Sequence, residues 1–159
     1  MFETVMEILT KELALYCDLN ALVKKQTDII KEGDIQGLNE ILKEQQKYIT
    51  SITGLEEQRQ QELSKVVPGK LPLPTISECI DMAPVEEKGR LKELYQELTA
   101  LLQKIRETND LNQQLLEQSM AFVNFSLNLI RPQQEQLNYG PPQQKQQVRD
   151  TRSIFNKEV

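Results

Sequence analysis

The sequence predicts an all-α protein, in which a long antiparallel helical hairpin and a long third helix form a three-helix bundle or coiled coil, followed by a flexible C-terminal tail. Long stretches carry apolar residues at alternating steps of three and four, the spacing of a helix with a packed face. Glycine and proline gather at a few points between these stretches, where helices are expected to end. The 38% hydrophobic and 27% charged content suits narrow apolar stripes better than a thick core.

The first helix is expected at about residues 2–32, because this segment fits one heptad frame. Its seam, the row of side chains that faces a neighbouring helix, comprises Phe2, Met6, Leu9, Leu13, Tyr16, Asn20, Val23, Thr27 and Ile30. The apolar stripe is wide enough to face more than one neighbour. The residues that widen it are Val5, Leu15, Leu19, Leu22 and Ile29. Polar seam residues, here Asn20 and Thr27, more often fix helix register than bind a ligand.

A tight turn at Gly33 and Asp34 is expected to join this helix to the second one, at about residues 35–66. Glycine suits the end of a helix, and an aspartate side chain can accept backbone N–H bonds at the start of the next. The second seam comprises Ile35, Leu38, Leu42, Gln45, Ile49, Ile52, Glu56, Arg59, Leu63 and Val66. Its polar members predict a thin apolar contact along part of an antiparallel hairpin.

The segment 67–83 is expected to be a linker with a short helical turn. Its three prolines lack the N–H group that a helix interior needs. Thr75 can cap a turn at residues 76–82. Three apolar residues of that turn could close one end of the bundle, namely Ile76, Cys79 and Ile80.

The third helix is expected at about residues 84–130, on the order of 70 Å long at 1.5 Å per residue. Its seam comprises Leu91, Leu94, Leu98, Leu101, Ile105, Thr108, Asn112, Leu115, Ser119, Phe122, Ser126 and Leu129. The leucine-rich first part suits packing into the groove of the hairpin. Past Thr108 the seam alternates polar and apolar residues.

The C-terminal half of this helix carries more apolar residues than one buried face needs. A second row appears there, with further apolar residues on the other sides of the helix. The candidate binding residues of this half are Leu111, Leu115, Phe122, Phe125 and Leu129. Two interpretations stay open, since the row can be covered by the hairpin or by a second copy of the chain, or it can form an exposed groove for an amphipathic partner helix.

Residues 1–131 are therefore expected to form the bundle, and residues 132–159 a flexible partner-binding tail. The tail has repeated glutamines, two adjacent prolines and few large apolar residues, so it cannot bury enough surface to offset its ordering entropy. Its isolated apolar residues are typical of short linear motifs that fold on binding. These residues are Leu137, Tyr139, Ile154 and Phe155.

The composition argues against an enzyme and against any metal or other cofactor. The chain has no histidine, which removes the commonest acid–base group and metal ligand and excludes the Glu-x-x-His motifs of di-iron bundles. The glycines form no phosphate-binding loop. Cys17 and Cys79 lie far apart and outside any Cys-x-x-Cys pair, so we interpret both as small apolar residues.

The charge argues against nucleic acid and membrane partners. A net charge of -5 repels polyanions, and the few basic residues of the tail do not reverse this. No apolar run approaches the roughly 20 residues of a membrane-spanning helix. The first residues carry acids where a secretory signal carries basic groups, so we expect a cytoplasmic protein.

Three parts of the chain, taken in order, resemble the FlgN-like family of flagellar export chaperones. Residues 108–130, TNDLNQQLLEQSMAFVNFSLNLI, resemble its last helix, where an Asn-rich turn precedes Leu-Leu and a long apolar run. Leu-Glu-x-x-Arg in the second helix is met at residues 55–59. The proline and the later Tyr-Gly that follow the last helix are met by Pro132 and by Tyr139 with Gly140.

This resemblance implies a cytoplasmic chaperone that binds hook-filament junction proteins and delivers them to the type III export apparatus. It further implies cargo binding by the C-terminal helix and by tail residues such as Ile154 and Phe155, and contact of Tyr139 and Gly140 with the cytoplasmic domain of the export gate. The alternative is a structural coiled-coil adaptor or a self-associating scaffold. A homodimer is compatible with both.

Overall fold

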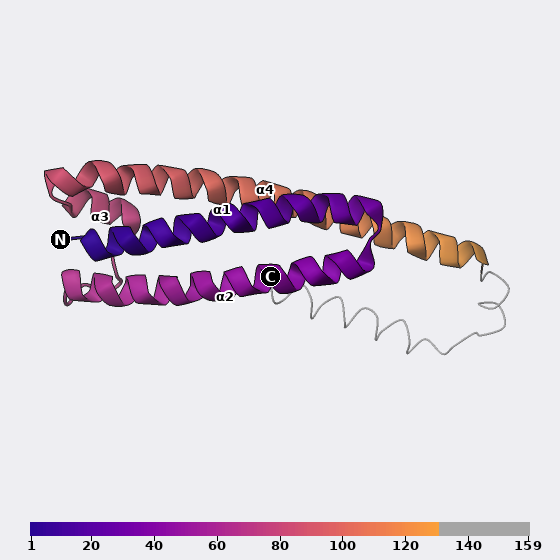
Figure 1. Ribbon diagram of the computed structural model, residues 1–159, viewed down its shortest axis with the longest axis horizontal. Coiled ribbons are helices and arrows are strands. Elements are labelled where there is room, and N and C mark those ends of the chain that lie inside the picture. Colours follow the sequence, from indigo (N-terminus) through magenta and orange to yellow (C-terminus); the bar gives the residue numbers. More distant parts are fainter. Residues whose placement is uncertain (131–159) are drawn as a thin grey trace. The chain divides into compact units, whose positions relative to one another are not determined.

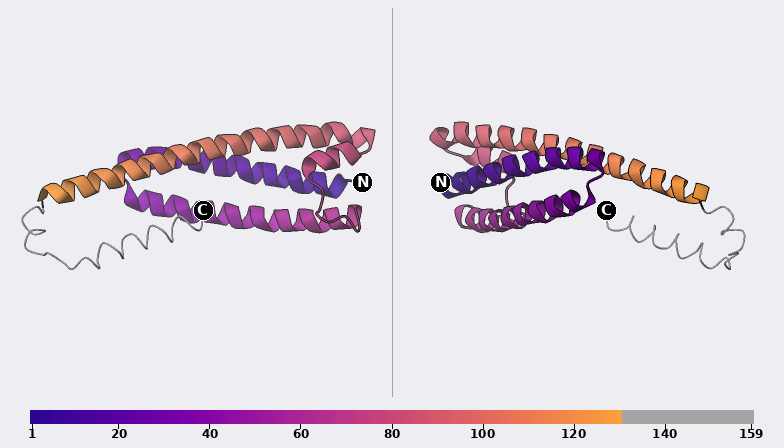
Figure 2. Two further views of the ribbon diagram at one scale, coloured as in Figure 1. Left: turned by 180° about the vertical axis from the view of Figure 1, so that it is seen from behind. Right: turned by 45° about the vertical axis from the view of Figure 1, so that its right-hand side comes forward.

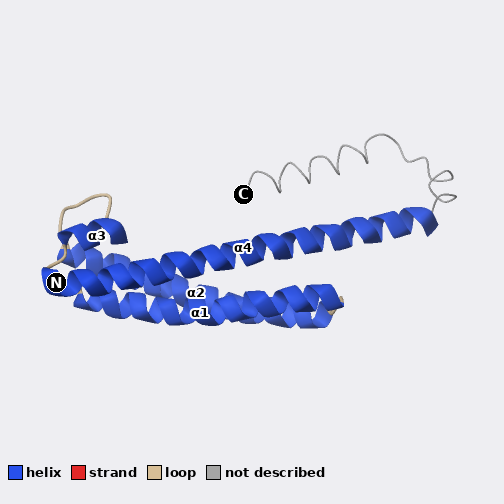
Figure 3. Cartoon of the chain, turned by 90° about the horizontal axis from the view of Figure 1, so that it is seen from above, coloured by secondary structure: helices blue, strands red, loops and turns tan. Residues whose placement is uncertain are grey.

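A computed structural model of the chain describes residues 1–130, which consist of helices and loops without a strand (Figure 3). The helices are α1 (Glu3–Glu32), α2 (Ile35–Val66), α3 (Ile76–Met82) and α4 (Val85–Ile130) (Figure 1). The all-α class is therefore confirmed, and the helix bounds agree with the predicted ones to within about one residue. The predicted tail lies outside the described residues.

The turn between α1 and α2 forms as its two residues predict. Gly33 adopts φ 71°, in the left-handed region that glycine enters without steric cost, and its N–H bonds back to the Ile30 carbonyl at 3.1 Å. The Asp34 carboxylate then accepts the Gly37 N–H at 2.9 Å. One glycine and one aspartate thus end α1 and start α2.

The short helix α3 begins at the predicted Thr75 cap. The Glu78 N–H donates to the Thr75 hydroxyl at 3.3 Å, and the Thr75 N–H donates to the Glu78 carboxylate at 2.8 Å. The bonds from Thr75 hold the pKa of Glu78 below its ordinary value. This reciprocal cap starts a helix in a segment that prolines otherwise keep from being helical. The helix α3 lies at the end of the bundle where the chain begins (Figure 2).

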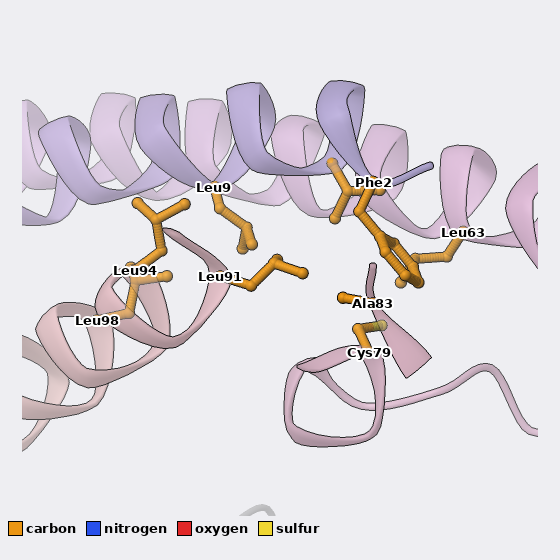
Figure 4. Close-up of a cluster of buried hydrophobic side chains, with 9 residues drawn as sticks. Phe2, Leu9, Leu63, Cys79, Ala83, Leu91, Leu94 and Leu98 are labelled. Carbon is orange, nitrogen blue, oxygen red and sulfur yellow. The ribbon is translucent and has the colours of Figure 1, made fainter. Parts of the chain in front are cut away.

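Helices α1 and α4 run in one direction and α2 runs in the other (Figures 1 and 2). The main apolar core lies at the end where the chain begins, and its fully buried members come from all four helices and their caps. They are Phe2, Val5, Leu9, Leu63, Cys79, Ala83, Leu91, Leu94 and Leu98. Phe2 points toward Leu63, Ala83 and Cys79, while Leu91 and Leu94 face Leu9 (Figure 4). The predicted closing of this end by α3 is confirmed through Cys79.

The core becomes more polar toward the turn between α1 and α2. A second apolar cluster of Leu19, Val23, Ile52 and Ile105 is followed by two buried polar pairs. The Gln45 amide donates to Gln26 at 2.7 Å. The Thr27 hydroxyl donates to Asn112 at 2.5 Å, and Asn112 in turn donates to the Val23 carbonyl at 3.0 Å. Because buried polar groups need specific partners, these pairs fix the register of the helices.

The predicted seam of α2 was wrong at Ile35, Leu42 and Ile49, which are exposed, whereas Ile41 is buried. Since α1 and α2 are the two helices whose backbones approach most closely, α2 buries chiefly the face toward α1. These three residues of the predicted row therefore lie outside that contact, whereas Gln45, Ile52 and Leu63 of the same row are buried. A pattern of apolar residues identified the helix correctly but could not show how many of its faces were covered.

The chain divides into two compact units, Met1–Glu117 and Gln118–Val159, with the boundary inside α4. The first unit contains the bundle. Of the second unit the structure describes residues 118–130, which form the last turns of α4. The predicted domain boundary after residue 131 falls where the described residues end, so it stays a prediction.

We predict that Leu94→Ala lowers the free energy of unfolding by about 2–5 kcal/mol, because it leaves a cavity in the main core. Leu129→Ala, the same change on the same helix at a side chain that is 65% exposed, should alter the free energy by less than about 0.5 kcal/mol. Urea unfolding followed by circular dichroism measures both. Equal effects of the two substitutions would contradict the assignment of the core to the first part of α4.

Candidate partner-binding surface

The described residues hold little that points to catalysis. Within residues 1–130, no group of three or more histidine, cysteine, aspartate or glutamate side chains is placed to hold a metal ion. Both cysteines are free, and burial raises the pKa of the Cys79 thiol, which makes it a weak nucleophile at neutral pH. None of the helices in this part of the chain has the length and apolarity to cross a bilayer.

The last turns of α4, residues 118–130, form an exposed apolar segment that we call the terminal segment. Its exposed apolar residues are Met120, Phe122, Val123, Phe125, Leu127, Leu129 and Ile130. Phe122 is 71% exposed and Ile130 is 79% exposed. No residue of this segment carries a charge. A partner could therefore cover it without removing an ion from water, and exposed apolar patches of this kind often mark protein interaction sites.

The five candidate residues on α4 share one face of the helix. At about 100° per residue, Leu111, Leu115, Phe122, Phe125 and Leu129 fall within an arc of roughly 80°. In the first unit, Leu111 is exposed and Leu115 is half-buried and has an interaction of its own. In the second unit, the two phenylalanines and Leu129 are exposed. Helical spacing thus aligns the residues, but they do not share one environment.

The terminal segment presents two apolar stripes. Phe122, Phe125 and Leu129 form the first, which we call the phenylalanine stripe. The second comprises Met120, Val123, Leu127 and Ile130. At 3.6 residues per turn, serines lie between the stripes on one side of the helix and asparagines on the other. Two separate stripes let such a helix contact two neighbours at once.

The side of α4 that carries Leu111, Leu115 and then the phenylalanine stripe changes in character along the helix. Upstream of Leu111 the same side of the helix carries Glu97, Lys104 and Glu107, which are exposed. A charged side is what a helix needs where it faces water. The change from charged to apolar residues at one side of a continuous helix indicates that a different surface begins there.

The tail residues that the sequence singled out lie outside the described residues. This applies to the candidate cargo residues Ile154 and Phe155 and to the candidate export-gate residues Tyr139 and Gly140. Their roles stay predictions.

Sequence reasoning placed Glu56 and Arg59 in the seam of α2 but missed their buried partner on α1, Glu12, with which they form a charged cluster in the first unit. Arg59 of α2 lies between Glu12 of α1, at 3.5 Å from its Nε, and Glu56, at 3.6 Å from its Nη2. Glu12 is buried, and burial raises the pKa of its carboxyl above its ordinary value while Arg59 opposes that rise. The sequence does contain a sign that Glu12 is buried, because Glu12 lies one heptad after Val5 and one heptad before Leu19, which are both buried.

Comparisons with known proteins identify the family of the chain. Residues 1–147 match the protein family described as FlgN protein. The chain is also similar to the uncharacterized protein YvyG of Bacillus subtilis (strain 168), with 30% identity over 138 residues, which cover 87% of this chain and 86% of that protein. Comparison with solved structures gives no significant match. The family match spans nearly the whole chain, including α1, α2 and all of α4. The chain therefore belongs to the FlgN family of flagellar export chaperones.

Proposed function

We propose that this chaperone binds the terminal amphipathic segments of flagellar hook-filament junction proteins, prevents their premature assembly and delivers them to the type III export gate. The observation that carries the proposal is the terminal segment of α4, which is apolar, exposed and free of charge. A chaperone needs such a surface, because an amphipathic helix binds by laying its apolar face against another apolar face.

The two stripes of the terminal segment suit this task. A cargo helix with one apolar face can bury the phenylalanine stripe, while the other stripe stays available for a second cargo helix. Aromatic side chains such as Phe122 and Phe125 contribute a large contact area and often dominate the energy of an interface. The serines and asparagines between the stripes can form hydrogen bonds at the edge of the contact without adding charge.

Binding has to be reversible, because the cargo is released for export. The contact area of one helix face is modest, and part of the binding energy is spent on ordering the segments that come together. We therefore propose that Ile154 and Phe155 of the tail close over the bound cargo as a second, weaker contact. A polar tail that loses entropy on docking keeps the complex dissociable.

Recognition of the export apparatus is assigned to a different part of the chain. We propose that Tyr139 and Gly140 contact the cytoplasmic domain of the export gate, so that cargo and gate are bound by separate residues. In this proposal the protein acts in the cytoplasm as a binding protein, without catalysis, cofactor, nucleic acid or membrane insertion.

A self-associating scaffold is the second candidate function, and the same stripes favour it. Two copies of the chain could bury their phenylalanine stripes against each other as a homodimer. Light scattering coupled to size exclusion separates the two functions. A tight oligomer whose mass does not change on dilution and which is lost in Phe122→Asp would support the scaffold and count against the chaperone.

We predict that Phe122→Asp weakens binding of a junction-protein terminal segment at least about tenfold, because the new charge would be buried in the contact. Its helicity and melting temperature should stay close to those of the unchanged chain, since Phe122 is exposed. The matched control is Asn124→Asp, which adds the same charge to the same helix between the stripes. Isothermal titration calorimetry measures affinity, and circular dichroism measures stability.

Loss of stability in Phe122→Asp that equals its loss of binding would show that the residue belongs to a core. Leu115→Asp provides the comparison, because Leu115 is half-buried and its substitution should lower both stability and binding. Before these titrations, co-purification with candidate junction proteins from the parent cell identifies the cargo. A Phe122→Asp variant that binds as well as Asn124→Asp would overturn the proposed site.

We also predict that Tyr139→Ala reduces binding to the cytoplasmic domain of the export gate and leaves cargo affinity within about twofold, because the two partners are held by different residues. Pull-down with the isolated gate domain and titration with the cargo segment are made on one preparation of the variant. Similar losses in both measurements would refute this division between cargo and gate contacts.

A further inference from the structure

A groove of about 230 Å³ opens on the first unit, and residues from α1, α2, α3 and α4 line it. We call it the Glu12 groove. Its charged members are the cluster Glu12, Glu56 and Arg59, and its edge includes Tyr95 and Leu102 of α4, which are 38% and 39% exposed. The groove is therefore reached from solvent and ends at a buried carboxylate.

One oxygen of the Glu12 carboxylate, Oε1, lacks a well-formed hydrogen bond. Glu12 is 5% exposed, and its Oε1 has no hydrogen-bond partner although it faces Arg59. The 3.5 Å that separate Oε1 from the Arg59 Nε exceed the usual length of an N–H···O bond, and that Nε has no partner either. Arg59 attracts both glutamates without bonding well to either. The groove thus contains a buried acceptor that one more donor would satisfy.

The cluster also carries an excess of negative charge, because two carboxylates face one guanidinium. The neighbouring Tyr16 reports this field, since burial raises the pKa of its hydroxyl and the charges of Glu12 and Glu56 raise it further, against a weaker opposing effect of Arg59. A cation that entered the groove would neutralise the cluster. Tyr16 and Tyr95 both line the groove, and tyrosine rings attract ammonium and guanidinium groups.

The apolar surface beside the groove indicates that the cation belongs to a helix. Ile49 and Leu42 precede Glu56 on α2 by one and two heptads, so they lie on the same side of α2, and they are 45% and 44% exposed. Leu102 of α4 offers an apolar side chain at the groove itself. A helix that covered these residues would turn the open three-helix arrangement into a four-helix bundle.

We propose that the Glu12 groove binds one lysine or arginine side chain carried by an amphipathic helix of a bound polypeptide. The proposal rests on the proposed function only in that this polypeptide is the exported cargo. The apolar face of the helix packs on α2 and α4, and its cation donates to Glu12 or Glu56. The groove then selects among apolar helices by charge, which the charge-free terminal segment of α4 cannot do.

A model helix tests the proposal without knowledge of the cargo. The probe is a helical peptide of about 18 residues, five turns, with leucines along one face, one arginine at the centre of that face and one tryptophan at its end. The matched peptide carries citrulline, which keeps the shape of arginine and lacks its charge. Because the chain has no tryptophan, peptide fluorescence reports binding directly. The arginine peptide should bind at least about tenfold more tightly than the citrulline peptide.

Variants of the full chain locate the effect. Glu12→Gln and Glu56→Gln should each reduce the preference for arginine, and Glu56→Gln changes a side chain that is 51% exposed, so it tests the proposal even where Glu12→Gln fails to fold. Glu57→Gln is the matched control, because the adjacent residue is exposed and points to another side of α2. Methyl resonances of Ile52 and Ile76, which line the groove, should shift on binding.

Three results would overturn the proposal. Equal affinity for the two peptides would show that the groove does not recognise charge. Absence of binding would show that the cluster is an ion pair that holds α1 against α2, with water satisfying its free atoms. A preference for arginine that survives both glutamine substitutions would place recognition elsewhere. The preference for the arginine peptide is expected to persist in Phe122→Asp. Failure of the proposal for the Glu12 groove is therefore distinguishable from failure of the terminal segment to bind cargo.

Discussion

The length of α4 is the constraint on which the rest of the structure depends. This helix has 46 residues, whereas α1 has 30 and α2 has 32. At 1.5 Å per residue, α4 exceeds the longer arm of the hairpin by roughly 20 Å, so the hairpin can cover only part of it. The covered part holds the buried leucines, and Asn112 is the last fully buried residue along α4. The amino acid composition of α4 differs beyond the covered part. Residues 118–130 carry no charge and have many exposed apolar side chains.

The distribution of apolar and polar contacts within the bundle supports the division of α4 into a covered part and an exposed part. Leucines and Phe2 pack at one end, where α3 closes the core, and burial of this apolar surface stabilises the bundle. Toward the turn between α1 and α2, glutamine, threonine and asparagine side chains replace apolar contacts. Such polar pairs contribute less energy but permit one register. They therefore fix which residues of α4 lie against the hairpin and which remain outside the core.

Most of the fold could be predicted from the sequence, because helix ends depend on local chemistry. Gly33, Asp34 and Thr75 end or start helices through hydrogen bonds to residues close in the chain, and all three acted as expected. Burial depends instead on distant neighbours. Spacing alone placed Ile49 in a seam although it is exposed, because cover by a neighbouring helix does not follow from the residue's own helix. Glu12 was missed for another reason, since the seam was chosen by its apolar residues and Glu12 is charged. The same limit applies to the binding surface. The spacing of apolar residues predicts its two stripes, but it does not show whether another helix or another protein covers them.

The central proposal is that the terminal segment of α4 is the primary contact of the cargo. Amide hydrogen exchange of the full chain, with and without a saturating junction-protein terminal segment, tests it most directly. The exposed terminal segment should exchange quickly alone and slow markedly on binding, while the buried turns around Leu9 and Leu94 should change little. Unchanged exchange at residues 118–130 in a complex known to be saturated would contradict the claim.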